Sequence, residues 1–352
     1  MPAGTDTNYA LQVLRGLAAL LVVFQHLSER THFAFAEINP DVSAMPFGDG
    51  GGIGVDIFFI ISGYIMARIS FDSFGRSNVV GPFMIKRIVR IFPLYFLATA
   101  LLASLKVAAG NGDGIGFPDF IMSVLFVPYP DGPILAPGWT LNFEMMFYLL
   151  FAGALLLPSR HLAISTLTAL IVGFWIWGRF ENAPAFFDYY GIDRILLFPV
   201  GLWLAEAQGL FGRAGRLRVS VPLLVALAVV PLLIVFPNFW VRTLFCLGFV
   251  AACVFLADLQ PRGVTNQAMI ALGDASFSLY LIHAIVFKTV TTVWVAVLGP
   301  NYVGAFATVS LVTVLATAYA SYRLIEVPVT ARLRRWFLRR PVPAGVPAQG
   351  GS

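Results

Sequence analysis

Long apolar stretches separated by short polar segments dominate the pattern along this chain. A bilayer core about 30 Å thick needs roughly 20 mostly apolar residues per helix, because lipid cannot satisfy an open backbone. The stretches that meet this requirement are 9–29, 52–70, 84–109, 139–157, 162–180, 190–208, 219–236, 239–257, 268–297 and 302–324. The alternating short segments of a membrane β-barrel are absent from the sequence. The pattern therefore predicts an all-α, polytopic membrane protein with about ten transmembrane helices.

Composition supports this prediction and excludes other classes of protein. Of the 352 residues, 59% are hydrophobic and 12% are charged, whereas a soluble domain carries about 25% charged residues. The chain thus lacks the polar surface of a soluble enzyme, and it is too apolar for a disordered protein. We interpret its net charge of +5 as a sign of membrane topology rather than of nucleic-acid binding.

The distribution of basic residues orients the predicted helices. With the N-terminus in the cytoplasm, most of the 23 Lys and Arg residues fall on the cytoplasmic side. The basic residues left outside are Arg30, Lys106, Arg179, Arg194, Arg242 and Lys288. Both termini are therefore expected in the cytoplasm. Residues 1–330 form the predicted membrane domain, and residues 331–352 form a basic, then Pro/Gly-rich tail expected to be disordered.

The cysteines and histidines do not suggest a metal centre. Cys246 and Cys253 are seven residues apart on one predicted helix, about 10 Å along its axis, which is too far for a disulfide. The four histidines are scattered without the spacing of a zinc site. We therefore expect no metal and no tightly bound cofactor.

Ionisable residues inside the apolar stretches are costly, so they are the first candidates for function. Arg15 and His26 are eleven residues apart, on one helical face and about 16 Å apart along the axis. Asp56, Glu144 and His283 are expected in the outer half of the membrane with His26. Tyr148 lies one turn below Glu144 on the same face. Snorkelling of Arg15 to lipid headgroups and an interfacial place for His26 remain the alternative.

A second group of candidates is basic and cytoplasmic. Lys86, Arg87 and Arg90 stand at the cytoplasmic end of the third apolar stretch. Arg87 and Arg90 are one turn apart, so they are expected to form a fork that suits phosphate groups. Anchoring of the helix by the positive-inside rule is the alternative interpretation.

Six motifs, in order along the chain, resemble the acyltransferase-3 family of integral membrane O-acyltransferases. They are Arg15-x10-His26, Gly54-Val-Asp-Ile-Phe-Phe-Ile-Ile-Ser-Gly63, Arg87-x-x-Arg90 followed by Ile91-Phe-Pro-Leu-Tyr95, Trp139-Thr-Leu-Asn-Phe-Glu144, Ser276-Phe-Ser-Leu-Tyr-Leu-Ile-His283 and Arg323-Leu-Ile-Glu326-Val-Pro328. The resemblance covers residues 8 to 330. The opening of the first stretch looks most like family members that modify exopolysaccharides, whereas Thr140 and Asn142 stand where Ser is common in the family.

The resemblance implies transfer of an acyl group, usually acetyl, from cytoplasmic acyl-CoA to a hydroxyl of a carbohydrate. Such acceptors include an exopolysaccharide, an O-antigen or a lipid-linked saccharide at a bacterial inner membrane. His26 is then the general base or a transient acyl carrier, and Arg15 holds the donor or orients the His26 helix. Lys86, Arg87 and Arg90 bind the CoA phosphates.

The remaining candidates belong to the acceptor side. Asp56 and Glu144 orient His26 or bind sugar hydroxyls, Trp139 stacks on the sugar ring, and Tyr148 lies beside them. His283 is either a second site residue or a buried core histidine, and the Arg323–Glu326 pair is expected to be structural. No nucleic-acid partner is expected.

Two other functions compete with acyl transfer. Buried carboxylates and histidines are also typical of a proton-coupled transporter, here of a saccharide or a lipid-linked intermediate. Such carriers favour Gly/Pro-broken helices at matching positions of two halves, which this sequence lacks. A non-catalytic subunit of a polysaccharide polymerase is the third possibility.

Overall fold

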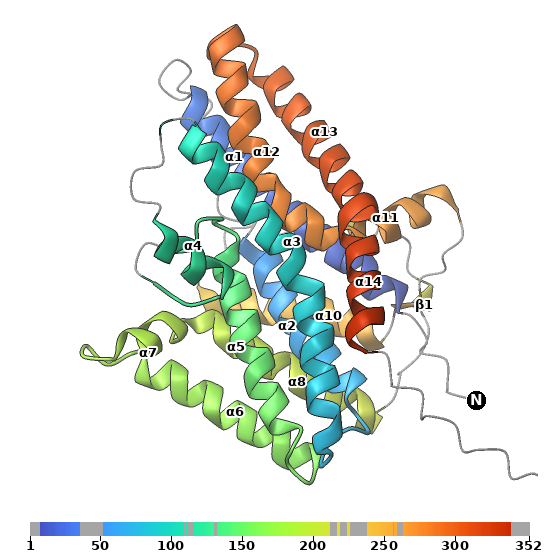
Figure 1. Ribbon diagram of the computed structural model, residues 1–352. Helices are drawn as coiled ribbons and strands as arrows, with labels where there is room; N and C mark the ends of the chain where they lie inside the picture. Colours follow the sequence, from blue (N-terminus) through green and yellow to red (C-terminus); the bar gives the residue numbers. More distant parts are fainter. Residues whose placement is uncertain are drawn as a thin grey trace, which may run out of the picture.

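The computed structural model describes residues 8–35, 52–108, 110, 116–129, 132–211, 217–218, 224–225, 238–255, 257–258 and 263–338. These residues form a helical bundle (Figure 1). Its first half contains α1 Tyr9–Phe35, α2 Gly52–Ile69, η2 Ser77–Val79, α3 Val80–Ala108, α4 Phe117–Val124, α5 Gly138–Ala154, α6 Arg160–Trp177, α7 Ala185–Tyr190, η3 Asp193–Leu196 and α8 Leu197–Phe211. The second half contains α10 Phe239–Phe255, α11 Val264–Asp274, α12 Ser276–Leu298, α13 Val303–Ser321, the π-helical turn η4 Tyr322–Glu326 and α14 Val327–Phe337. The only strands among the described residues are β1 Leu217–Arg218 and β2 Ala257–Asp258, which pair in parallel.

The all-α polytopic fold predicted from the sequence is confirmed. Within the described part of the chain, 7 helices are long and apolar enough to cross a membrane. Large apolar side chains such as Leu101, Leu170 and Val312 are exposed on these helices, as expected of surfaces that face lipid. The protein is therefore a multi-pass membrane protein.

Several predicted stretches differ in detail from the observed helices. The stretch 219–236 lies outside the described residues, apart from positions 224–225. The stretches 139–157 and 239–257 correspond to α5 and α10, which have 17 residues each. The stretch 268–297 divides at Ala275 into α11 and α12. The count of ten spans and the cytoplasmic location of both termini stay predictions.

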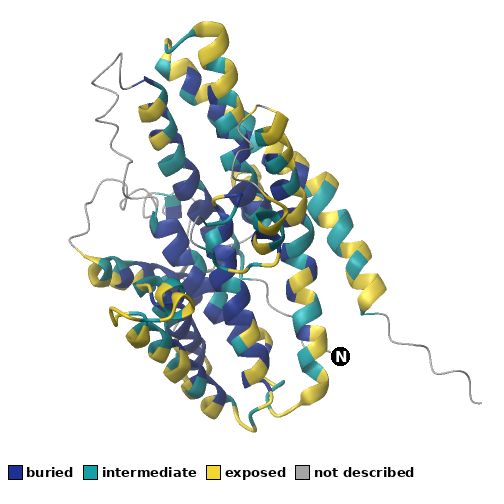
Figure 2. Cartoon of the chain, turned by 60° about the vertical axis from the view of Figure 1, so that its left-hand side comes forward, coloured by how far each residue is buried: buried dark blue, intermediate teal, exposed yellow. Residues whose placement is uncertain are grey.

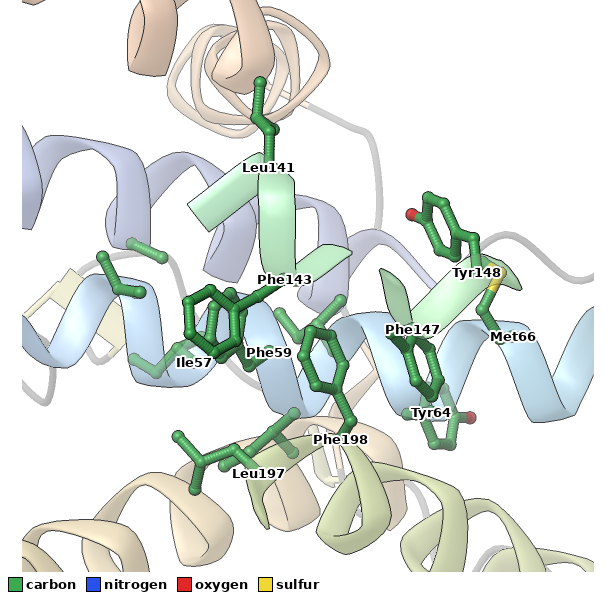
Figure 3. Close-up of a cluster of buried hydrophobic side chains, with 14 of the residues drawn as sticks. Ile57, Phe59, Tyr64, Met66, Leu141, Phe143, Phe147, Tyr148, Leu197 and Phe198 are labelled. Atoms are coloured by element: carbon green, nitrogen blue, oxygen red, sulfur yellow. The ribbon is translucent and has the colours of Figure 1, made fainter. Parts of the chain in front are cut away.

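α2 is the central helix, and glycines bring its neighbours close. A Cβ on Gly63 would clash with the carbonyl oxygen of Phe198 on α8, and one on Gly201 would clash with that of Ile60 on α2. The rings of Phe147 and Phe198 stack beside this contact, with centroids 4.3 Å apart (Figure 3). Among the 7 membrane-length helices, buried residues are most frequent along α1 and α2. They gather in the middle of the bundle, while outer faces of the surrounding helices are exposed (Figure 2). Glycine at the helix crossings thus lets the backbones of α2 and α8 approach closely.

The C-terminal segment differs from the predicted disordered tail. Residues 331–337 continue α14 as helix, and residues 339–352 lie outside the described part of the chain. α14 begins at Val327-Pro328 and follows η4 without a break, since Glu326 has helical backbone angles and the Val327 N–H donates to the Tyr322 carbonyl oxygen. In the turn before it, Glu326 accepts a hydrogen bond from Ser278 at 2.6 Å. Its partner is thus on α12, whereas the predicted partner Arg323 is exposed.

Candidate active site

A small cavity lies at the centre of the bundle between α1, α2, α3, α5 and α12. Its volume is about 80 Å³, and most of its wall is apolar. The polar residues that line it are Arg15, Ser62, Arg90, Thr140, Glu144, Tyr148, Ser276 and Tyr280. Four residues predicted from the sequence for catalysis, donor binding or acceptor binding, namely Arg15, Arg90, Glu144 and Tyr148, therefore share one cavity.

Close packing of α1 against α11 positions Arg15. Gly16 lies so near α11 that a Cβ on it would be 2.9 Å from the backbone nitrogen of Gly273. In this arrangement Arg15 Nη2 donates to Ser276 Oγ at 3.1 Å, and Nη1 donates to Gln12 Oε1 at 3.3 Å. The guanidinium group thus faces the cavity and polar neighbours, rather than snorkelling to a lipid-facing surface.

Glu144 lies with the arginines of this cavity, whereas the sequence analysis grouped it with the histidines. It accepts hydrogen bonds from Tyr148 Oη and, at 3.4 Å, from Ser62 Oγ. The physical reason lies where α5 starts. Gly138 packs directly on the ring of Tyr95, which is midway along α3. Because α5 begins beside the middle of α3, Glu144, six positions after Gly138, reaches the central cavity instead of the outer half.

His26 and His283 form a stacked pair at the other end of α1. Their ring centroids are 5.0 Å apart with an interplanar angle of 22°. His26 is 42% exposed, and its Nδ1 lies 2.7 Å from Glu29 Oε2. His283 is fully buried, with Nδ1 3.3 Å from the Leu279 carbonyl oxygen and no hydrogen-bond partner for Nε2 among the described residues. The pair combines an accessible imidazole, a carboxylate partner and a buried aromatic support.

Asp56 does not contact the histidines, which corrects the prediction that it orients His26. It is fully buried and pairs with two arginines, through Arg194 Nε at 2.8 Å and Arg242 Nε at 2.6 Å. Trp139 belongs to the same region, since the Arg194 guanidinium carbon lies 5.8 Å from its ring centroid. Trp139 is absent from the wall of the central cavity.

Arg87 and Arg90 face different cavities, so they do not form the single fork predicted from their spacing. Arg90 lines the central cavity. Arg87 is buried against the rings of Phe83 and Tyr148, at 5.6 and 5.8 Å from their centroids. It lines a second cavity of about 580 Å³ beside Lys86. The polar lining of this second cavity consists of Ser70, Ser73, Asn78, Lys86, Arg87 and Arg334.

Four residues of these sites were missed by the sequence analysis. Glu29 had a usable signal, because a carboxylate three positions after a histidine shares its helical face. Arg194 and Arg242 stood out only as basic residues on the side where few were expected. Arg334 was one of several arginines in a basic tail. Within the described residues, no cluster of three or more His, Cys, Asp or Glu side chains could hold a metal ion.

Comparison with known proteins places this arrangement in a family. The profile of the Acyl_transf_3 family, described as an acyltransferase domain, matches residues 8–322. The chain is 34% identical to the exopolysaccharide production protein ExoZ of Rhizobium meliloti over 84% of this chain and 93% of the relative. It is 27% identical to the acyltransferase MdmB of Streptomyces mycarofaciens, over 97% of this chain and 96% of that protein.

A third relative is BcsY of Komagataeibacter xylinus, whose name describes a membrane-bound transacylase. It is 26% identical over 91% of this chain and 85% of its own length. No solved structure matches. Because the family profile and these relatives cover nearly the whole membrane domain, the chain belongs to the acyltransferase-3 family of membrane-bound acyltransferases.

Proposed function

We propose that this protein transfers an acetyl group from cytoplasmic acyl-CoA to a hydroxyl of a carbohydrate at a bacterial inner membrane. The acceptor is an exopolysaccharide, an O-antigen or a lipid-linked saccharide. Membership of a membrane-bound acyltransferase family supports the reaction class. The name of the relative ExoZ, an exopolysaccharide production protein, supports the carbohydrate acceptor.

The observation that carries this proposal is the distribution of polar groups along α1. Arg15 faces the central cavity, and His26 stacks on His283 three turns further along the same helix. Eleven residues of helix separate the two side chains by about 16 Å. A cationic site for a donor and a basic site for an acceptor are thus held on one rigid element, at different depths in the bundle.

The cavities suit the two parts of acyl-CoA. Lys86, Arg87 and Arg334 line the larger cavity, where cationic side chains stand beside Ser and Asn donors, a combination that binds phosphates well. The central cavity is narrow and largely apolar, with Arg15 and Arg90 in its wall. We assign the phosphates of CoA to the larger cavity and the acyl-pantetheine arm to the central one. Arg87 stacks on Tyr148, which lines the central cavity, so the two sites adjoin.

The outer end of the central cavity leads toward the histidines. Thr140 Oγ1 and Tyr280 Oη lie 2.8 Å apart in its wall. The Tyr280 ring is also 6.0 Å from the ring of His283. In our proposal the acyl-pantetheine arm passes this Thr–Tyr pair to bring the thioester to His26.

His26 acts as the general base in this proposal. With Nδ1–H donating to Glu29, its Nε2 is free to accept a proton. The acceptor hydroxyl oxygen attacks the thioester carbonyl carbon while its proton passes to Nε2. The carbon–sulfur bond then breaks, and the CoA thiolate takes up the proton from the imidazolium. The products are an ester and CoA-SH, and the histidine returns to its neutral form.

The deciding experiment uses the purified protein in vesicles with labelled acetyl-CoA and an oligosaccharide acceptor. Release of CoA-SH that depends on the acceptor, with label recovered in the sugar ester, supports the proposal. Uptake of the saccharide into the vesicles without CoA release would instead favour a proton-coupled transporter. Binding of neither acyl-CoA nor saccharide would leave a non-catalytic role.

A further inference from the structure

The ion cluster formed by Asp56, Arg194 and Arg242 carries more positive than negative charge. One buried carboxylate pairs with two guanidinium groups, which leaves a net charge of +1 on the cluster. One arginine is enough to balance the buried carboxylate, so the second adds a positive charge on the partly exposed side of the cluster. Among the described residues, no second carboxylate pairs with either arginine. The cluster therefore has the charge to bind a further anionic group.

The arginines also retain free hydrogen-bonding capacity. Each meets Asp56 through Nε, and their terminal nitrogens form no other hydrogen bond with described residues. Asp56 is 0% exposed, whereas the side chains of Arg194 and Arg242 are 28% and 22% exposed. The carboxylate thus supports the two guanidinium groups from inside. Their outer edges can present several N–H donors to an oxyanion.

The cluster lies at the same end of the bundle as His26. A Cβ built on Gly52 would be 2.9 Å from Arg194 Nη2 and 3.8 Å from Gln25 Oε1. Gln25 in turn donates to Glu29, the carboxylate partner of His26. Gly52 therefore lies between the arginine cluster and the residues beside His26. A side chain at this position would fill the space that separates them.

An aromatic surface adjoins the cluster. The Arg194 guanidinium carbon lies 5.8 Å from the ring centroid of Trp139, and that of Arg242 lies 5.6 Å from the ring centroid of Phe239. Trp139 is half-buried and packs edge to face on Phe143. Aromatic faces beside cationic donors can stack on a sugar ring while the donors bind its charged substituent.

We propose that Arg194 and Arg242 bind an anionic group of the acceptor, so that the acceptor is an acidic saccharide. The group is a carboxylate on a sugar or a phosphate on a lipid-linked saccharide, since both present the same oxyanion to two guanidinium groups. This inference rests on the proposed function insofar as the bound saccharide is acylated beside His26. The binding step itself does not depend on that reaction.

Three probes test the proposal. The first is an oligoglucoside that ends in glucuronate, the second is the same oligosaccharide with its carboxyl group reduced to the alcohol, and the third is the reduced oligosaccharide attached to farnesyl diphosphate. Equilibrium binding to the protein in nanodiscs is measured without acyl-CoA, and acetyl transfer is measured separately. Binding of farnesyl diphosphate without the sugar is measured as well, and it gives the contribution of the lipid to binding of the third probe. The glucuronate and diphosphate probes distinguish the two sources of the anion.

We expect at least one anionic probe to bind roughly tenfold more tightly than the neutral oligosaccharide. Arg194→Gln and Arg242→Gln each leave Asp56 with one arginine, so the ion pair that joins the helices is kept. Each should remove that preference and leave binding of the neutral probe unchanged. Arg194→Lys keeps the charge and should retain part of the preference.

Arg179→Gln is the matched control. It removes one positive charge at a neighbouring position, but Arg179 pairs one-to-one with Asp193 and stacks on Trp175. Its binding of all three probes should equal that of the wild type. Equal binding of anionic and neutral probes by the wild type, or an equal loss for both in the two glutamine variants, would overturn the proposal. Anion-selective binding without acetyl transfer would refute the proposed function and leave the anion site standing.

Discussion

Arg15 and His26 lie three turns apart on α1 and have different surroundings. At Arg15, the cations line the central cavity, and their neighbours are hydroxyl and amide groups with one carboxylate, Glu144, in the same wall. At His26, the imidazole is partly exposed and has a carboxylate of its own, Glu29, on the same helix. The difference teaches that one apolar helix supports two chemical environments, a cavity lined by cations and a partly exposed imidazole paired with a carboxylate.

The largest effect is expected from His26→Ala. Loss of a general base lowers the rate by about 10²–10⁴. Acetyl transfer by the purified variant is measured together with acyl-CoA binding, which should not change because the cations proposed to bind the donor line cavities that do not include His26. His32→Ala is the control, since His32 is an exposed histidine of the same helix. A His26→Ala enzyme within a few-fold of the wild type would remove His26 from the mechanism.

Glu29→Gln should have the next largest effect. The amide cannot accept the Nδ1 proton as strongly as the carboxylate, so the ring loses its preferred orientation and tautomer. Because Glu29 is 49% exposed, we expect a loss of roughly tenfold in kcat rather than the full loss of the base. The donor KM should stay constant. A rise in donor KM with kcat unchanged would contradict the separation of the two ends.

Arg90→Lys and Arg87→Lys sharpen the comparison at the donor end. Lysine keeps the charge for topology but loses the planar fork and the stacking of a guanidinium group. Each variant should insert normally and raise the apparent donor KM by roughly fivefold to tenfold. Arg87→Lys should act through the larger cavity. It should therefore also weaken binding of the isolated nucleotide fragment of CoA, measured with 3′-phospho-ADP. Arg90→Lys should leave binding of that fragment unchanged.

Arg76→Lys is the control for this pair, because Arg76 is an exposed residue outside both cavities. Donor titrations identical to the wild type for all three lysine variants would mean that these arginines serve topology alone. The donor site would then lack its proposed anchor.

Glu144→Gln should have the smallest effect and tests the position of Glu144 directly. Since Glu144 shares the central cavity with Arg15 and Arg90, the amide removes a negative charge near the donor arm. We expect a change of a few-fold in acyl-CoA affinity, measured by titration calorimetry with a non-hydrolysable acyl-CoA, and no change in acceptor KM. A defect confined to the acceptor KM would instead indicate that Glu144 acts on the acceptor together with the histidines.

The local pattern of the sequence was sufficient for the membrane class, most helix positions and the family. Helices in lipid must be long and apolar, and this requirement acts on each segment separately. The same local reasoning paired Arg15 with His26 on one face of α1, as the helix places them. It also identified the three charged residues that line the central cavity, Arg15, Arg90 and Glu144, because an ionisable group in an apolar stretch stands out without knowledge of its neighbours.

Only the tertiary structure decided which partner each charged group has. Asp56 and Arg194 are 138 positions apart, and His26 stacks on a residue of α12, so neither contact leaves a trace in local spacing. Arg87 and Arg90 have the spacing of a fork, yet the packing of Phe83 and Tyr148 directs Arg87 to another cavity. The depth at which α5 begins, set by Gly138 on Tyr95, places Glu144 in the central cavity with Arg15 and Arg90 rather than beside the histidines. The electrostatic energy of each group depends on the charges that packing brings near it, and helix packing is a non-local property of the chain.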